Sequence, residues 1–193
     1  MRKFIRSMNE SISALVANVA AYHLHGVSFD FEFGDSTASD TKDFAAFLAG
    51  LRLALRPLDE RVTVYSIKFI RMTSDIALLS KTVDLVADGA CYDGRSYKDW
   101  LSNYNRLLQE GVNRSAVAPA MMANTGRGMW NCDNASFAER YDKVVADGLN
   151  QIAIFGFDAT RTAFHPGTKP DVKHCFGQWL PFAKRSIAGH SFC

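Results

Sequence analysis

The sequence predicts an α/β fold in which about five parallel strands alternate with helices. Apolar residues recur at spacings of three and four in some segments and at a spacing of two in others, and the two kinds of segment alternate along the chain. The length of 193 residues, with 48% hydrophobic and 22% charged residues, suits one globular domain with a packed core. We therefore expect a single domain over residues 1–193.

The charge balance argues against two classes of partner, nucleic acids and membranes. The chain has 22 Lys and Arg against 20 Asp and Glu, which gives a net charge of +2. This charge is too balanced for non-specific electrostatic binding to nucleic acid or anionic lipid. Its longest apolar runs are too short to span a membrane, and polar residues 9–11 interrupt the first of them. We therefore expect no nucleic-acid and no membrane partner.

The first elements are predicted from helical spacing and capping residues. Residues 3–23 place apolar side chains three and four positions apart, as an amphipathic helix requires. A second helix should end near Leu55, since Pro57 lies just beyond it. Asp40, or one of the Ser and Thr residues before it, can cap its start.

The same alternation continues to the C-terminus. Further strands are predicted at 62–67, 83–90, 116–121 and 151–155, and further helices at 73–81, 96–109, 135–148 and 173–188. This order is shared by open doubly wound sheets and by (β/α) barrels. A nucleotide-binding sheet is disfavoured, because the only G-x-G, at 126–128, lacks the third glycine and lies late in the chain.

The clearest strand covers residues 26–33 and has one polar and one apolar face. Its polar face carries Ser28, Asp30 and Glu32. Its apolar face carries Val27, Phe29, Phe31 and Phe33. On a barrel strand the inward face leads to the active site, and two carboxylates packed there would raise at least one pKa and supply a general acid. The alternative is that both carboxylates face water, but the flanking helices favour a sheet covered on both faces.

Segment 25–32, H-G-V-S-F-D-F-E, resembles the strand-four motif D-G-x-D-x-D-x-E of glycoside hydrolase family 18, the chitinases and endo-β-N-acetylglucosaminidases. The resemblance implies that Glu32 protonates the glycosidic oxygen and that Asp30 orients the substrate acetamide and stabilises an oxazolinium ion. In that family the substrate's own N-acetyl oxygen replaces an enzyme nucleophile. The implied partner is a carbohydrate containing β-linked N-acetylglucosamine, in polymers or N-glycans, and the implied chemistry needs no cofactor and no metal.

Segment 90–93, A-C-Y-D, is similar to the M-x-Y-D motif of strand six in the same family. The resemblance implies that the Tyr92 hydroxyl holds the acetamide and that Asp93 helps to bind sugar. Trp130 lies in a glycine-containing loop after a predicted strand, where a substrate loop is expected. Asp158 follows the last predicted strand, where the family commonly places a Trp, and we include it with Ser28 among the substrate-binding candidates.

Several positions depart from the family pattern and keep other functions open. His25 and Ser28 replace the first two acids of the strand-four motif, and Ala90 replaces the Met of strand six. One alternative is a catalytically inactive relative that binds glycan, and another is a non-enzymatic α/β scaffold. The compartment, the state of the four cysteines and the oligomeric state stay open.

The resemblance covers strands four to eight, so the expected fold is a partial (β/α) TIM-type barrel. Strands at the ends of such a partial barrel would expose unpaired backbone to water. We expect either that the chain is truncated from a longer protein, or that a second copy or another chain completes the sheet. Truncation is the interpretation that we favour.

Overall fold

The computed structural model describes residues 7–32, 35–66, 71–89, 96–122, 134–149 and 151–155. The strands in these residues are β1 (Gly26–Asp30), β2 (Arg61–Ser66), β3 (Leu85–Asp88), β4 (Val117–Met122) and β5 (Ala153–Phe155). The helices are α2 (Met8–Tyr22), α3 (Ala38–Leu55), α4 (Arg71–Ser74), α5 (Ile76–Thr82), α6 (Tyr97–Gln109) and α7 (Asn134–Ala146). The predicted alternation of strands and helices is confirmed over this part of the chain. The helix predicted at 173–188 lies outside the described residues.

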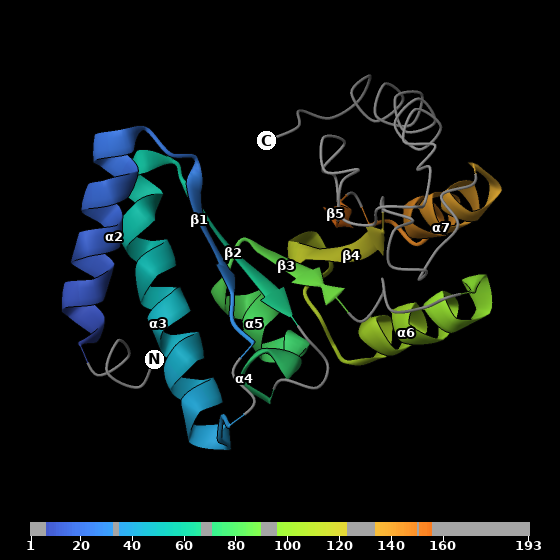
Figure 1. Cartoon of the computed structure of the whole chain (residues 1–193), viewed down its shortest axis with the longest axis horizontal. Helices are drawn as coiled ribbons and strands as arrows, with labels where there is room; N and C mark the ends of the chain where they lie inside the picture. The colour runs from blue at the N-terminus through green and yellow to red at the C-terminus, as the bar shows by residue number, and fades with distance from the viewer. Residues whose placement is uncertain are drawn as a thin grey trace, which may run out of the picture.

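The five strands form one parallel sheet in the order β1-β2-β3-β4-β5. A doubly wound sheet reverses its strand order at a switch point, which places helices on both faces. Here the order follows the chain without reversal, and crossovers of one hand then place the helices on one face. Figure 1 shows the helices around the outside of the curved sheet. The architecture is that of a partial (β/α) barrel, as predicted.

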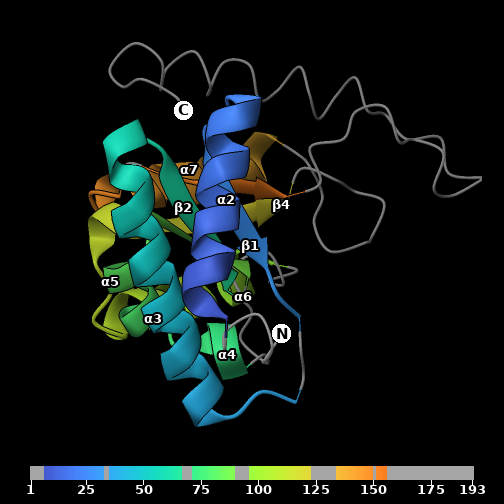
Figure 2. The ribbon, with the colours of Figure 1, turned by 90° about the vertical axis from the view of Figure 1, so that its left-hand side faces the viewer.

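Helix α3 begins where the sequence places a capping residue. The Thr37 side chain accepts a hydrogen bond from the Asp40 backbone N–H at 3.2 Å, and the Asp40 carboxylate accepts one from the Thr37 N–H at 2.8 Å. This reciprocal pair satisfies two N–H groups that have no partner within the helix. It fixes the start of the helix that connects β1 to β2. Figure 2 shows α3 beside α2, with which it packs.

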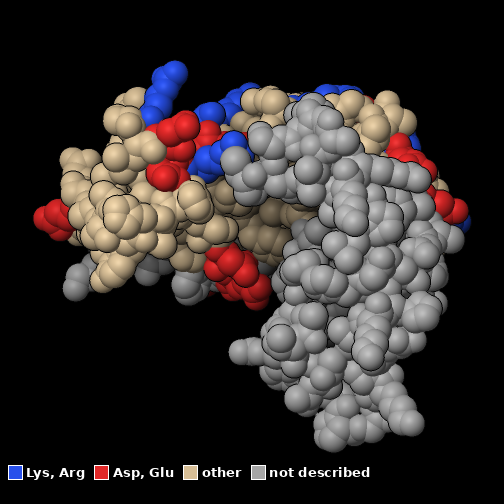
Figure 3. All heavy atoms as spheres, turned by 90° about the horizontal axis from the view of Figure 1, so that it is seen from above, with Lys and Arg blue, Asp and Glu red and all other residues tan. Residues whose placement is uncertain are grey.

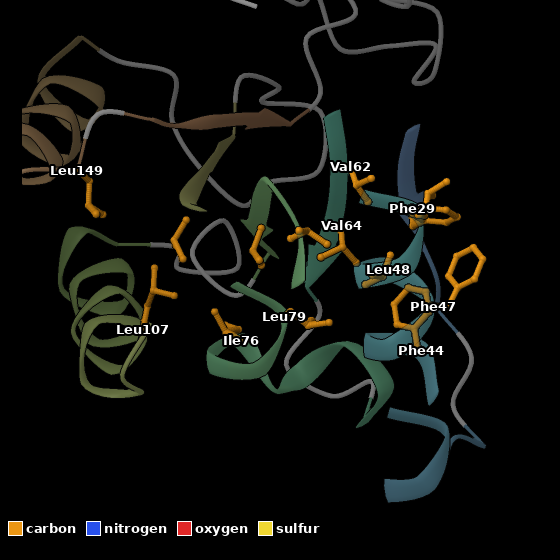
Figure 4. Close-up of a cluster of buried hydrophobic side chains, with 14 of the residues drawn as sticks. Phe29, Phe44, Phe47, Leu48, Val62, Val64, Ile76, Leu79, Leu107 and Leu149 are labelled. Carbon is orange, nitrogen blue, oxygen red and sulfur yellow. The ribbon is translucent and has the colours of Figure 1, made fainter. Parts of the chain in front are cut away.

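The hydrophobic core lies between the sheet and the helices. Phe29, Val64, Val86 and Val117 are paired in register across four neighbouring strands, and all four are buried. Figure 4 shows Phe29 and Val64 directed toward the buried side chains of α3. The α3 side chains of this core are Phe44, Phe47, Leu48, Leu51 and Leu55. Every second residue of the strands therefore belongs to the core, and the residues between them face the barrel interior.

Some boundaries differ from the prediction. The helix predicted at 73–81 is split into α4 and α5, because the Asp75 side chain accepts a hydrogen bond from the Leu78 N–H at 2.9 Å and caps a new helix. Strand β3 starts at Leu85, two residues later than predicted. Before it, the Asp84 carboxylate accepts hydrogen bonds from Arg52 Nε at 2.7 Å and from the Val62 N–H at 2.9 Å. Asp84 thus ties α3 and β2 to the start of β3.

The surface of the described residues agrees with the balanced charge of the sequence. On the face drawn in Figure 3, basic and acidic side chains are interspersed among other residues. Among the described helices, none has both the length and the apolar character needed to cross a membrane.

Candidate functional site

Strand β1 separates acidic side chains from aromatic ones. Asp30 is the last residue of the strand, Ser28 lies two residues before it and Glu32 two residues after it, and all three are exposed. Phe29 is buried and Phe31 is half-buried, with ring centroids 6.1 Å and 5.3 Å from that of Phe44 on α3. The packing of the phenylalanines on α3 fixes which way the strand faces. It leaves the hydroxyl and the two carboxylates on the interior side of the sheet.

The two carboxylates influence each other. Partial burial raises the pKa of Asp30 above its ordinary value, and the negative charge of Glu32 raises it further. A carboxyl group with a raised pKa holds its proton more readily, which is the direction that an acid–base site requires. Ser28 adds a neutral hydroxyl on the same face. The carboxyl end of β1 therefore presents two interacting carboxylates and one hydroxyl group on the same face.

The interior face of the sheet is less sheltered than we expected. Helices were expected on both faces of the sheet, but in the described residues they lie on the outer face, and Asp30 and Glu32 are exposed. The reason is the sequential strand order, since the interior of a (β/α) barrel is sheltered only where the sheet closes on itself. In the part of the chain that the structure describes, β1 and β5 are the two ends of the sheet.

Tyr65 is a residue of this face that the sequence analysis did not single out. It pairs in register with Asp30 on one side and with Ala87 on the other. Its side chain is half-buried, while Val64 before it and Ser66 after it are fully buried on the helix side. The alternation of residues in the predicted strand 62–67 could have identified it, because Tyr65 lies on the opposite face from Val62 and Val64.

Four of the predicted site residues cannot be placed beside the carboxylates. Tyr92, Asp93, Trp130 and Asp158 lie outside the described residues. Of the candidates, the structure therefore brings together Ser28, Asp30 and Glu32, and the roles of the other four stay predictions.

The described residues contain no group of three His, Cys, Asp or Glu side chains that could hold a metal ion. His23 and His25, the histidines nearest to β1, are both exposed. His23 ends α2 in the left-handed conformation, with φ of 52°. Its position is therefore explained by the end of the helix.

No protein-family model and no curated protein matches the chain. Solved chitinase structures do match it. The chitinase of Chromobacterium violaceum ATCC 12472 has a TM-score of 0.64 at 13% identity, over 96% of this chain and 73% of that chain. Catalytic domain 2 of the Ostrinia furnacalis Group II chitinase has a TM-score of 0.53 at 15% identity, over 63% of this chain and 40% of that chain. The same domain, as a mutant, has also been solved in complex with penta-N-acetylchitooctaose, (NAG)5.

A third similar structure is the C-terminal domain of a putative chitinase from Desulfitobacterium hafniense DCB-2, with a TM-score of 0.51 at 18% identity, over 62% of this chain and 42% of that chain. The chain thus spans about two fifths of the length of the insect and Desulfitobacterium domains that it matches. At these identities the likeness concerns the fold alone. At that level the predicted resemblance is confirmed: the chain has the fold of part of a chitinase-type (β/α) barrel.

Proposed function

We propose that the chain is part of a glycoside hydrolase that cleaves β-linked N-acetylglucosamine polymers or N-glycans. The observation that carries this proposal is the pair of Asp30 and Glu32 at the carboxyl end of an interior strand face, where burial and the charge of Glu32 raise the pKa of Asp30. Catalytic residues of (β/α) barrels come from the carboxyl ends of strands. The chitinase-type fold of the chain supports the same assignment.

In the proposed mechanism Glu32 donates its proton to the glycosidic oxygen as the bond to the anomeric carbon breaks. The carbonyl oxygen of the substrate's own acetamide attacks the anomeric carbon and forms an oxazolinium ion. Asp30 orients the acetamide and stabilises the positive charge of that ion, with Tyr92 holding the acetamide oxygen. Water then attacks the anomeric carbon, and Glu32 accepts its proton, so that the original configuration is retained.

We also propose roles for the remaining candidates and for the chain as a whole. Asp93, Ser28, Trp130 and Asp158 would bind the sugar chain around the cleaved bond. The 193 residues would form the C-terminal part of a (β/α)8 barrel, strands four to eight, with the other strands supplied by a longer form of the protein or by another chain.

A second candidate function is glycan binding without hydrolysis. The observation that favours it is Ser28, which is exposed beside Asp30 on the interior face. A serine hydroxyl cannot share a proton with Asp30 as a second carboxyl group would. Asp30 would then lack a neighbour that helps it to change its charge during the reaction.

The test is hydrolysis of chitopentaose, the five-sugar oligomer of β-linked N-acetylglucosamine, by the full-length protein. Glu32→Gln removes the proton donor and keeps the size of the side chain, so it should lower kcat by roughly 10²- to 10⁴-fold. Glu139→Gln alters an exposed glutamate of α7 and should leave kcat unchanged. Saturable binding without product would select the second function, and neither binding nor product would contradict both.

A further inference from the structure

In the part of the sheet that the structure describes, an aromatic side chain of the interior face lies on the strand next to Asp30. Tyr65 lies on β2 in register with Asp30, and neighbouring strands in a sheet are about 4.8 Å apart. It faces the interior because Val64 before it and Ser66 after it are buried on the helix side. A ligand bound at the carboxyl end of β1 would therefore reach the Tyr65 side chain.

The Tyr65 ring lies against Gly89, the residue that follows β3. A Cβ atom on Gly89 would lie 2.6 Å from the Tyr65 hydroxyl oxygen, 2.7 Å from Cζ and 2.9 Å from Cε1. These distances are shorter than van der Waals contact, so the ring occupies the space that a side chain at position 89 would need. Gly89 thus allows the tyrosine to lie across β3.

The hydroxyl oxygen of Tyr65 is enclosed, while the residue as a whole is half-buried. A ligand on this face would therefore meet ring carbon rather than the hydroxyl group. What Tyr65 offers to a ligand is therefore aromatic carbon surface close to two carboxylates. Such a surface suits a ligand that has both an apolar face and polar groups. Many ligand sites combine aromatic side chains with a few polar side chains that orient the ligand.

We propose that Tyr65 is an apolar platform of the sugar site, given room by Gly89, against which an N-acetylglucosamine unit packs beside Asp30. This inference rests on the proposed function. A sugar ring has carbon-bound hydrogens on its faces, and its acetamide ends in a methyl group, so both parts can contact an aromatic ring. The proposal assigns a substrate-binding role to Tyr65 and a positioning role to Gly89.

The test is calorimetric titration of the full-length protein with chitopentaose. Tyr65→Phe keeps the aromatic ring and should leave the Kd unchanged. Tyr65→Leu removes the aromatic platform and should raise the Kd roughly three- to tenfold. Gly89→Ala displaces the ring and should raise the Kd by a similar factor. Gly50→Ala is the matched control, since Gly50 lies in α3 and faces the Ile12 side chain of the neighbouring helix α2.

The double variant, Tyr65→Leu with Gly89→Ala, distinguishes loss of the aromatic platform from a general loss of structure. In a Tyr65→Leu background the ring is already absent, so Gly89→Ala should add little to the Kd. Additive effects would show that Gly89 does not act through Tyr65. In the unaltered protein, the ring proton resonances of Tyr65 should shift when chitopentaose is added, which does not depend on any variant folding.

The outcomes distinguish this inference from the proposed function. If the unaltered protein binds chitopentaose and Tyr65→Leu binds it equally well, the platform is wrong while the proposed function stands. If Tyr65→Phe loses as much affinity as Tyr65→Leu, the hydroxyl rather than the ring surface makes the contribution. If the unaltered protein neither binds nor cleaves chitopentaose, the proposed function fails and the platform with it.

Discussion

Asp30 is held where its negative charge is disfavoured. Partial burial and the charge of Glu32 both raise its pKa, although its side chain remains exposed at the end of β1. A folded state that raises the pKa of an acid binds the proton more tightly than the unfolded chain does. Stability therefore falls as the pH rises through the pKa of Asp30. Residues kept at such a cost are more typical of a functional site than of a solvated surface.

The first prediction concerns the stability of Asp30→Asn. At neutral pH the variant should have a higher melting temperature than the unaltered protein, because asparagine has no charge for burial to disfavour or for Glu32 to repel. The difference should vanish at pH values below the ordinary pKa of 3.8, where the carboxyl group is protonated in both states. Thermal unfolding monitored by circular dichroism over this pH range checks the expectation. Asp43→Asn, an exposed position on α3, is the control, and an equal gain there would contradict the account.

At the scale of one element, α3 decides which face of β1 is available for chemistry. Its buried residues pack against Phe29: the ring centroids of Phe29 and Phe47 are 5.7 Å apart, and the two ring planes meet at 82°. Leu48, the residue after Phe47, is completely buried, whereas Leu53 is 69% exposed. The helix therefore turns one side to β1 and β2 and the other to solvent. Because Phe29 packs against α3, its neighbours Ser28 and Asp30 in β1 must face the interior.

The second prediction compares the two sides of α3. Leu48→Ala should lower the free energy of unfolding by about 2–5 kcal/mol, because it leaves a cavity against the sheet. Leu53→Ala makes the same chemical change on the exposed side and should alter it by less than about 0.5 kcal/mol. Urea denaturation of both variants measures the difference. Equal effects would mean that α3 does not pack on the sheet as described.

At the scale of the whole molecule, much of the fold could be predicted from the sequence. The alternation of Phe29 and Phe31 with polar residues predicted β1, and the Ser, Thr and Asp residues near position 40 predicted the cap of α3. Both signals are local, since strand and helix periodicities and caps depend on residues within a few positions. The resemblance of segment 25–32 to a strand-four motif also predicted the barrel, which the chitinase structures confirm at the level of the fold.

What could not be predicted depends on contacts between distant segments. The alternation of strands and helices is the same in doubly wound sheets and in barrels, so periodicity alone does not separate them, whereas the observed strand order does. The pairing of Tyr65 with Asp30, and the space that Gly89 leaves for its ring, arise from strand register and packing. The exposure of Asp30 and Glu32 was the less favoured of two alternatives at the sequence level, because it depends on which face the helices leave uncovered.

The central claim is that Asp30 and Glu32 form an interacting pair of acids on the interior face of the sheet. The most direct measurement is an NMR titration of the Asp30 carboxyl carbon in the full-length protein and in Glu32→Gln. The pKa of Asp30 should lie above its ordinary value of 3.8, should fall when Glu32 loses its charge, and should still remain above 3.8, since burial is the larger cause. An Asp30 pKa at the ordinary value, unchanged by Glu32→Gln, would contradict the claim and the sugar-cleaving site built on it.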